Sequence, residues 1–191
     1  MSDGVKEWTH MTKSLGSVNT TCPIRSDDHS AGSDTAAITL VAYCDFQCPY
    51  CRHASPIMKR LQDRLGDRLR LVFRHFPLIQ KHLLAQQAAE ASEAADAQGQ
   101  FWAMHDLLFE HQRTLEKDDL CRYAEILQLD LVRFERDVTG RMYAKRVERD
   151  HEGGRLIGVE GTPTFYLNGV VHTDEDTLEE FVLRLNDSTS V

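Results

Sequence analysis

The part of the sequence that most constrains the fold runs from residue 37 to residue 76. Residues 37–43 are a β-rich apolar run (Ala-Ile-Thr-Leu-Val-Ala-Tyr), which is typical of a buried strand. The pair Cys48 and Cys51 follows, and apolar residues at helical spacing then predict a helix from Arg52 to Leu65, ended by Gly66. Residues 69–76 predict a second strand. We therefore expect a β–α–β unit with two cysteines where the first strand gives way to the helix.

The rest of the chain predicts a helical block followed by a hairpin. Apolar spacing is helical over residues 79–157, with a kink or break expected at Gly153-Gly154. Asn168-Gly169 between two short β-rich runs, residues 164–167 and 170–172, predicts a hairpin, and a helix is expected over residues 174–185. This order predicts an α/β fold, with residues 35–78 and 158–191 in one domain and residues 79–157 as an all-helical insertion.

The first 34 residues predict no regular structure. They are rich in Ser, Thr, Asp and Gly without a clear period, so residues 1–34 are expected to form a mobile lead-in, with Cys22 as an exposed or loosely held thiol. The amino terminus is too polar for a signal peptide, and no apolar run approaches the length of a membrane span. These features favour a cytoplasmic location.

Charge and cysteine content narrow the function classes. A net charge of −8 argues against non-specific binding to nucleic acid or to an anionic membrane. Five cysteines in 191 residues do not form the framework of a secreted disulfide scaffold, and in a reducing compartment such clustering favours redox or metal chemistry.

The pair Cys48 and Cys51 has a physical reason to be reactive. At a helix N-terminus the unpaired N–H groups and the helix dipole favour a negative sulfur, which predicts a Cys48 pKa lowered to roughly 3.5–7.5. Cys51, one turn further on, is expected to lie deeper and to resolve a mixed disulfide formed at Cys48. Pro49 suits the first helical turn and stiffens it, while Tyr50 adds no charge, so these two residues are expected to tune the redox properties.

A second part of the site is expected at Gly161-Thr162-Pro163. A proline that precedes a strand and follows a glycine is a suitable place for a cis peptide bond. Such a bond would turn the Thr162 backbone toward the dithiol, where it could pair with an extended segment of a substrate. Most X-Pro bonds are trans, and it is the nearby cysteine pair that favours cis here.

Several motifs along residues 28–185 together carry a family resemblance. They are Asp28-His29, Gly32, residues 38–41, residues 45–51, residues 73–78, residues 98–102, Met104-His105 and residues 158–165. In these motifs, and in the long separation of Cys48 from Pro163, the chain resembles the DsbA-like thioredoxin family. The resemblance implies a thioredoxin fold with an inserted all-helical domain, a nucleophilic Cys48, a resolving Cys51 and a cis Pro163. It implies no cofactor, and partners that are protein or peptide thiols and disulfides, with glutathione as a further candidate.

Two positions depart from the family pattern. Its members commonly carry a glutamate six residues before the first active cysteine, where this chain has Ala42. Asp45 or water must then carry the proton during resolution, or turnover is slow. Cys44 stands where members usually have a small residue, so this third thiol either fills a gap or forms an alternative disulfide.

Other hypotheses remain open at this stage. The spacing of Cys44, Cys48 and Cys51 also resembles the cluster motif of radical S-adenosylmethionine enzymes, and a zinc site using these cysteines with His53 is a third candidate. Domains of this kind are also found fused to membrane antiporters, so a binding or regulatory module without turnover is a further alternative. The preferred interpretation assigns no metal ligand: the nine histidines are treated as packing or surface residues, and Glu90, Glu93 and Asp96 as a solvated helix face.

Overall fold

The computed structural model describes residues 21–172 and Glu180. The closing helix expected over residues 174–185 therefore lies outside the described residues apart from Glu180, which is helical. Among the residues that the structure describes, none of the helices has the length and apolar character needed to cross a lipid bilayer.

The centre of the molecule is a mixed sheet. Over the described ranges it has five strands in the order β1-β3-β2-β4-β5. They are β1 (His29–Ala31), β2 (Ile38–Cys44), β3 (Leu69–His75), β4 (Thr164–Leu167) and β5 (Val170–Val171). β2 and β3 are parallel, with Leu40 opposite Leu71, and the other neighbouring pairs are antiparallel. The predicted β–α–β unit and the hairpin are confirmed.

β2 sends its side chains alternately into two apolar clusters, one on each face of the sheet. Leu40 and Ala42 belong to the larger cluster, which also holds the buried side chains of α1 (Pro49–Leu65) and of the helical block. Val41 and Tyr43 belong to the smaller cluster. A strand buried on both faces needs a continuous apolar run, which explains why its sequence does not alternate with polar residues.

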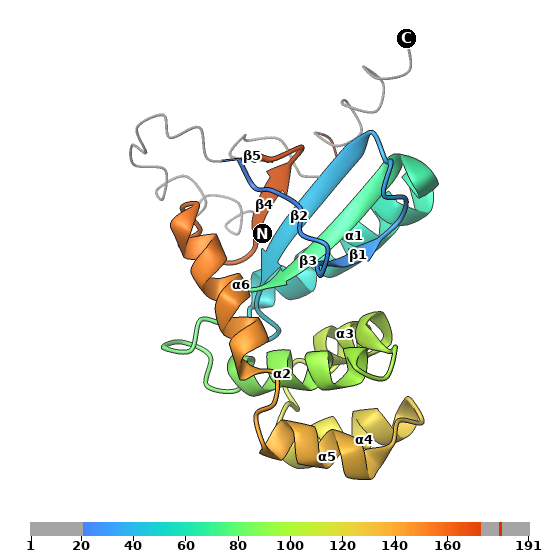
Figure 1. The fold of residues 1–191 in the computed structure, drawn as a ribbon, viewed down its shortest axis with the longest axis vertical. Helices are drawn as coiled ribbons and strands as arrows, with labels where there is room; N and C mark the ends of the chain where they lie inside the picture. Colours follow the sequence, from blue (N-terminus) through green and yellow to red (C-terminus); the bar gives the residue numbers. More distant parts are fainter. Residues whose placement is uncertain (1–20, 173–179, 181–191) are drawn as a thin grey trace, which may run out of the picture.

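The helices lie around this sheet as Figure 1 shows. The short 3₁₀ turn η2 (Gly66–Arg68) follows α1. The helical block stacks beyond one end of the sheet, and its last helix returns beside the strands. The elements are α2 (Ala85–Asp96), α3 (Phe101–Glu110), α4 (Lys117–Ile126), α5 (Leu131–Thr139) and α6 (Ala144–Leu156). All of them fall between β3 and β4 in the sequence, so the predicted α/β fold with an inserted set of helices is confirmed.

No break occurs at Gly153-Gly154, because both glycines lie inside the continuous helix α6. A Cβ placed on Gly154 would lie 2.9 Å from the ring of Tyr43 and 3.0 Å from the ring of Phe76. Gly154 thus allows α6 to approach the sheet closely. The helix ends at Leu156, and Gly158, two residues further on, has a φ of +91°.

The expected lead-in is wrong for residues 21–34, which pack on the sheet. β1 pairs with β3, and Cys22 is buried, with its N–H donating to the Gly169 carbonyl at 3.0 Å. Asp28 accepts two hydrogen bonds from Arg74, of 2.8 and 2.7 Å, and the side chains of both residues are buried. Since these partners lie 36 or more residues away, the local sequence of this segment gives no sign of its order.

Candidate active site

Cys48 lies at the N-terminus of α1, as the sequence predicts. It is the N-cap residue, with φ −72° and ψ 120°, and Pro49 stands in the first turn, where no N–H is needed. The Arg52 N–H donates to the Cys48 carbonyl at 3.2 Å and starts the helical hydrogen-bond pattern. Tyr50 is half exposed, so the two central residues of the motif lie at the surface side of the turn.

Cys51 lies behind Cys48, in the larger apolar cluster. It is fully buried, and Cys48 is 3% exposed. The backbone N–H of Asp45 points at the Cys51 sulfur, with an N···Sγ distance of 3.4 Å. This donor can stabilise a negative charge on Cys51 when a disulfide to Cys48 is broken.

The segment Thr162-Pro163 meets the cysteine pair. The peptide bond between these residues is cis, as the sequence predicts, and the Cys48 thiol donates to the Thr162 carbonyl at 3.2 Å. The structure thus brings together residues that are 114 positions apart. Thr162 Oγ1 is buried and has no hydrogen-bond partner among the described residues.

The expected lowering of the Cys48 pKa is wrong for this closed, reduced arrangement. The hydrogen bond with Cys51 and burial together raise the pKa of the Cys48 thiol well above its ordinary value. Burial, followed by the neighbouring Cys44 thiol, also raises the pKa of Cys51. The helix N-terminus still favours a negative sulfur, but the sequence could not show how completely the pair is shielded from water.

Asp45 and Gln112 hold the turn that carries the cysteines. One carboxylate oxygen of Asp45 accepts from the Leu78 N–H at 2.8 Å and lies 2.7 Å from His82 Nδ1. Gln112 follows α3 and donates 2.8 Å hydrogen bonds to the carbonyls of Phe46 and Cys48. Sequence analysis missed Gln112, because nothing local links it to residues more than 60 positions earlier.

Cys44 is a buried thiol at the end of β2, in the same apolar cluster as Cys48 and Cys51. The fold differs from that expected for the radical-enzyme alternative, because a helical block follows the β–α–β unit instead of repeated strand–helix units. The zinc alternative needs three or more ligand atoms close together. In the described part of the chain, three such atoms do lie within 4.8 Å of one another, but they do not belong to these cysteines.

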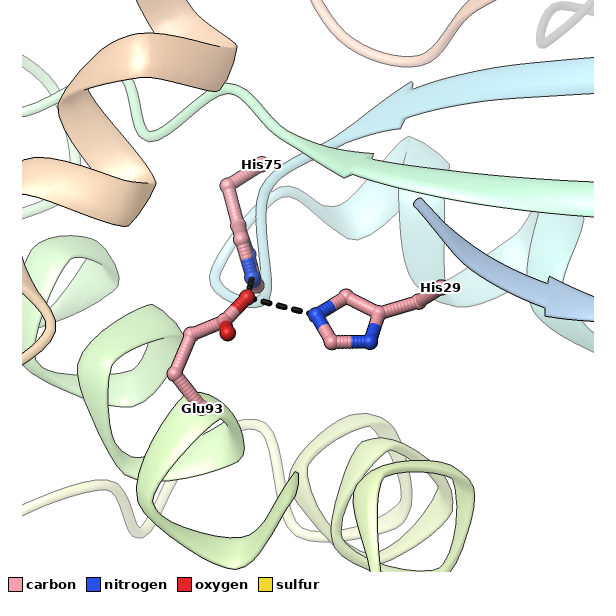
Figure 2. Close-up of side chains that lie close together, drawn as sticks. All are labelled: His29, His75 and Glu93. Carbon is pink, nitrogen blue, oxygen red and sulfur yellow. Dashed lines mark hydrogen bonds and ion pairs between the residues drawn. The ribbon is translucent and has the colours of Figure 1, made fainter. Parts of the chain in front are cut away.

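The three atoms belong to His29, His75 and Glu93. From the sequence, the histidines were expected to be packing or surface residues and Glu93 to lie on a solvated helix face. Glu93 is 4% exposed, and its neighbour Glu90 is 3% exposed, so the solvated helix face is wrong for both glutamates. Figure 2 shows the two imidazoles pointing at one carboxylate oxygen of Glu93, at N···O distances of 2.6 and 2.7 Å. Asp96 alone of the three acids keeps a half-exposed side chain.

The architecture and the position of the dithiol define a thioredoxin fold with an inserted helical block. BdbD from Bacillus subtilis superposes with a TM-score of 0.76 at 23% identity, covering 90% of this chain and 98% of that one. A thioredoxin-like oxidoreductase from Silicibacter pomeroyi gives 0.74 at 23% identity, covering 87% and 95%. The alpha-DsbA1 protein from Wolbachia pipientis gives 0.71 at 19% identity, covering 86% and 92%. The fold is that of the DsbA-like proteins.

Residues 25–187 match the family model described as thioredoxin, and the chain belongs to this family. Curated relatives include Na(+)/H(+) antiporter NhaA 3 from Salinispora tropica, 47% identical over 83% of this chain and 24% of the relative. Another is Na(+)/H(+) antiporter NhaA from Herminiimonas arsenicoxydans, 43% identical over 74% of this chain and 22% of the relative. The chain spans about a quarter of the length of these relatives.

Proposed function

We propose that this chain is a thiol–disulfide oxidoreductase in which Cys48 exchanges disulfides with protein or peptide substrates, or with a small thiol such as glutathione. The observation that supports it best is the position of the Cys48 thiol, between the N-terminus of α1 and the Thr162 carbonyl, with Cys51 directly behind. Every group that a dithiol exchange needs is present in this arrangement: an attacking or attacked sulfur, a second sulfur and a backbone edge.

In the oxidising direction, a substrate thiolate attacks the sulfur of Cys48 in the Cys48–Cys51 disulfide. A mixed disulfide forms, the bond between the two cysteines breaks, and Cys51 leaves as a thiolate beside the Asp45 N–H. A second substrate thiolate then attacks the substrate sulfur, and Cys48 leaves with the electron pair. The substrate is oxidised by two electrons and the dithiol is reduced; the reducing direction is the reverse.

Thr162 is the proposed contact for the substrate backbone. An extended substrate segment beside it would add a short strand next to the dithiol, a common mode of peptide recognition. Thr162 and Pro163 are only partly buried, which supports access of a substrate segment to their backbone. Backbone pairing accepts many sequences, so it fits a protein that acts on varied substrates.

The test is a glutathione redox titration of the wild type and of single cysteine variants. The wild type should show one two-electron transition, and Cys48→Ser should show none. In Cys51→Ser, the Cys48 thiolate should attack a peptide disulfide, release one peptide thiolate and remain trapped as a mixed disulfide, because the resolving thiol is absent. Cys121→Ser removes a partly exposed thiol from α4 and should titrate like the wild type. If Cys48→Ser also titrates like the wild type, Cys48 is not the nucleophile and the proposal fails.

The second candidate function is a binding or regulatory module that keeps the fold without turnover. The antiporter relatives favour it, because the chain matches only about a quarter of their length. The raised pKa of Cys48 and the alanine at position 42 point the same way. Such a module should neither reduce insulin nor oxidise a peptide dithiol, whereas the oxidoreductase should do at least one of the two at a rate that depends on Cys48.

We also propose that the chain works in the cytoplasm. Its cysteine usage supports this, because clustered thiols outside a disulfide framework are typical of a reducing compartment. Rapid alkylation in cells tests the proposal. Cys48 and Cys51 should be found mainly reduced, and a fully oxidised pair in growing cells would contradict it.

A further inference from the structure

A second chemically defined cluster lies apart from the dithiol, where the sheet meets the helical block. It consists of His29 from β1, His75 from the end of β3 and Glu93 from α2, so three separate elements fix its side chains. All three residues are buried, with exposed fractions of 8%, 1% and 4%. From these residues we propose that the cluster is a binding site for one divalent transition-metal ion, with zinc as the ion that fits best.

The donor set favours such an ion. Two imidazole nitrogens and one carboxylate oxygen make up a known set of protein ligands for zinc, which leaves a fourth position for water or another ligand. Imidazole suits zinc, copper, iron and nickel, whereas calcium and magnesium prefer sites built from oxygen alone. The cysteines are not needed, so this inference does not depend on the proposed function.

The distances suit an ion after a small adjustment. The donor atoms lie within 4.8 Å of one another, and Oε1 of Glu93 is 2.6 Å from His29 Nε2 and 2.7 Å from His75 Nε2. Around a tetrahedral zinc, ligand atoms lie about 3.3–3.5 Å apart, given metal–ligand distances of about 2.0–2.2 Å. The two Glu93–histidine pairs must therefore separate by less than about 1 Å, which side-chain rotation of Glu93 can supply. Figure 2 shows both rings already turned toward the same carboxylate.

Asp96 gives a second, independent observation. It lies one turn after Glu93 on α2, and its carboxylate is 3.5 Å from Nδ1 of His29, the ring nitrogen that faces away from the cluster. Histidines that bind metals usually donate from the second nitrogen to a carboxylate, which fixes the ring and increases its basicity. A surface cavity of about 340 Å³ is lined in part by His29 and Asp96.

The guanidinium of Arg146 lies near the cluster and offers Glu93 a partner other than a metal ion. Arg146 Nε is 3.9 Å from Glu93 Oε1, but its guanidinium also contacts the Asp150 carboxylate and donates to the Asp27 carbonyl at 2.9 Å. Asp150 also pairs with Arg25, so Arg146 shares this carboxylate with a second arginine on the side away from the histidines. Without an ion, the same residues form a purely structural network of hydrogen bonds, and this is the outcome that the experiment must distinguish.

The experiment uses the full chain carrying Cys48→Ser and Cys51→Ser, so that the active-site thiols cannot bind metal. After treatment with a chelator, the protein is titrated with Zn²⁺ in competition with a chromophoric chelator, and separately with Co²⁺ followed by its visible spectrum. We expect one equivalent of Zn²⁺ to bind, and a tetrahedral Co²⁺ spectrum without the near-ultraviolet band of thiolate ligation. No binding, or a thiolate band, overturns the proposal.

Variants in the same background locate the site. Glu93→Gln keeps the shape of the side chain and should weaken zinc binding by more than about 100-fold, beyond the effect of an outer-shell change. Asp96→Asn, at a half-exposed position that should not disturb folding, should weaken it by about 10- to 100-fold. Glu90→Gln is the matched control, because Glu90 is a buried glutamate on the same helix that pairs with Arg141. If Glu90→Gln weakens binding as much as Asp96→Asn does, or if Asp96→Asn leaves it unchanged, the site lies elsewhere.

Discussion

The two adjacent glycines of α6 should respond in opposite directions to alanine. In a helix, replacing glycine by alanine stabilises the folded state by roughly 0.5–1 kcal/mol, because alanine loses less backbone freedom on folding. At Gly153 the new methyl group meets only the end of the Arg25 side chain, at 3.7 Å, which is an ordinary contact. Gly153→Ala should therefore raise the free energy of unfolding by about that amount.

At Gly154 the same gain meets a larger penalty. The methyl group would lie 2.9 Å from Tyr43 and 3.0 Å from Phe76, and both rings are buried in the smaller apolar cluster. Forcing a methyl group into a packed core costs about 1–3 kcal/mol. Since the helical gain is common to both variants, Gly154→Ala should be less stable than Gly153→Ala by about 1–3 kcal/mol.

Urea unfolding of the reduced proteins, followed by circular dichroism, measures this difference. The dependence of the free energy on urea should be equal in the two variants, so the comparison rests on the midpoints. A difference of 2 kcal/mol corresponds to about 4–8 °C in Tm for a chain of this size. If the two variants are equally stable, α6 does not approach the sheet as closely as described, and the explanation for glycine at position 154 is wrong.

Two further predictions concern buried charges. Asp28→Asn leaves the Arg74 guanidinium buried without its charge partner and should cost about 3–5 kcal/mol of stability. Asp34→Asn, which changes an exposed carboxylate that pairs with Arg70, should cost less than about 1 kcal/mol. Equal losses in urea unfolding would contradict the importance of the buried pair. Burial opposes the charged form of His29, but the carboxylates of Asp96 and Glu93 outweigh it and raise its pKa to about 9. The stability that the charged form of His29 contributes should be complete below about pH 6.5 and should decline as the pH rises to about 9. Unfolding measured across pH with a chelator present tests this, and the pH dependence should disappear in His29→Gln.

The parts of the fold that the sequence predicts are those with a local signal. β2 shows itself as a continuous apolar run, and the Asn168-Gly169 turn carries the conformational preference of a hairpin, with φ values of 48° and 84°. The N-terminus of α1 and the cis bond before Pro163 also follow from short motifs. In each case the residues that decide the structure are neighbours in the sequence.

The parts that sequence analysis misses depend on distant partners. β1 is only three residues long and has no apolar alternation, and it exists because β3 lies beside it. Glu93 has the sequence environment of an exposed helix face, but α2 is covered on most sides, and its charge is met by histidines from two strands. The prediction of a lowered Cys48 pKa is wrong for the same reason, since the burial of Cys48 depends on residues from both halves of the chain.

The two hydrogen bonds from Gln112 have a consequence for protein engineering. The insertion that contains this residue is joined to the active-site turn through the carbonyls of Phe46 and Cys48. A shortened protein made by deleting the insertion would lose both donors, although the Cys48 carbonyl would still accept from the Arg52 N–H. A graft of this dithiol motif onto a smaller scaffold therefore requires a replacement donor. Gln112→Ala in the intact chain is the simplest way to measure the effect of losing these two hydrogen bonds.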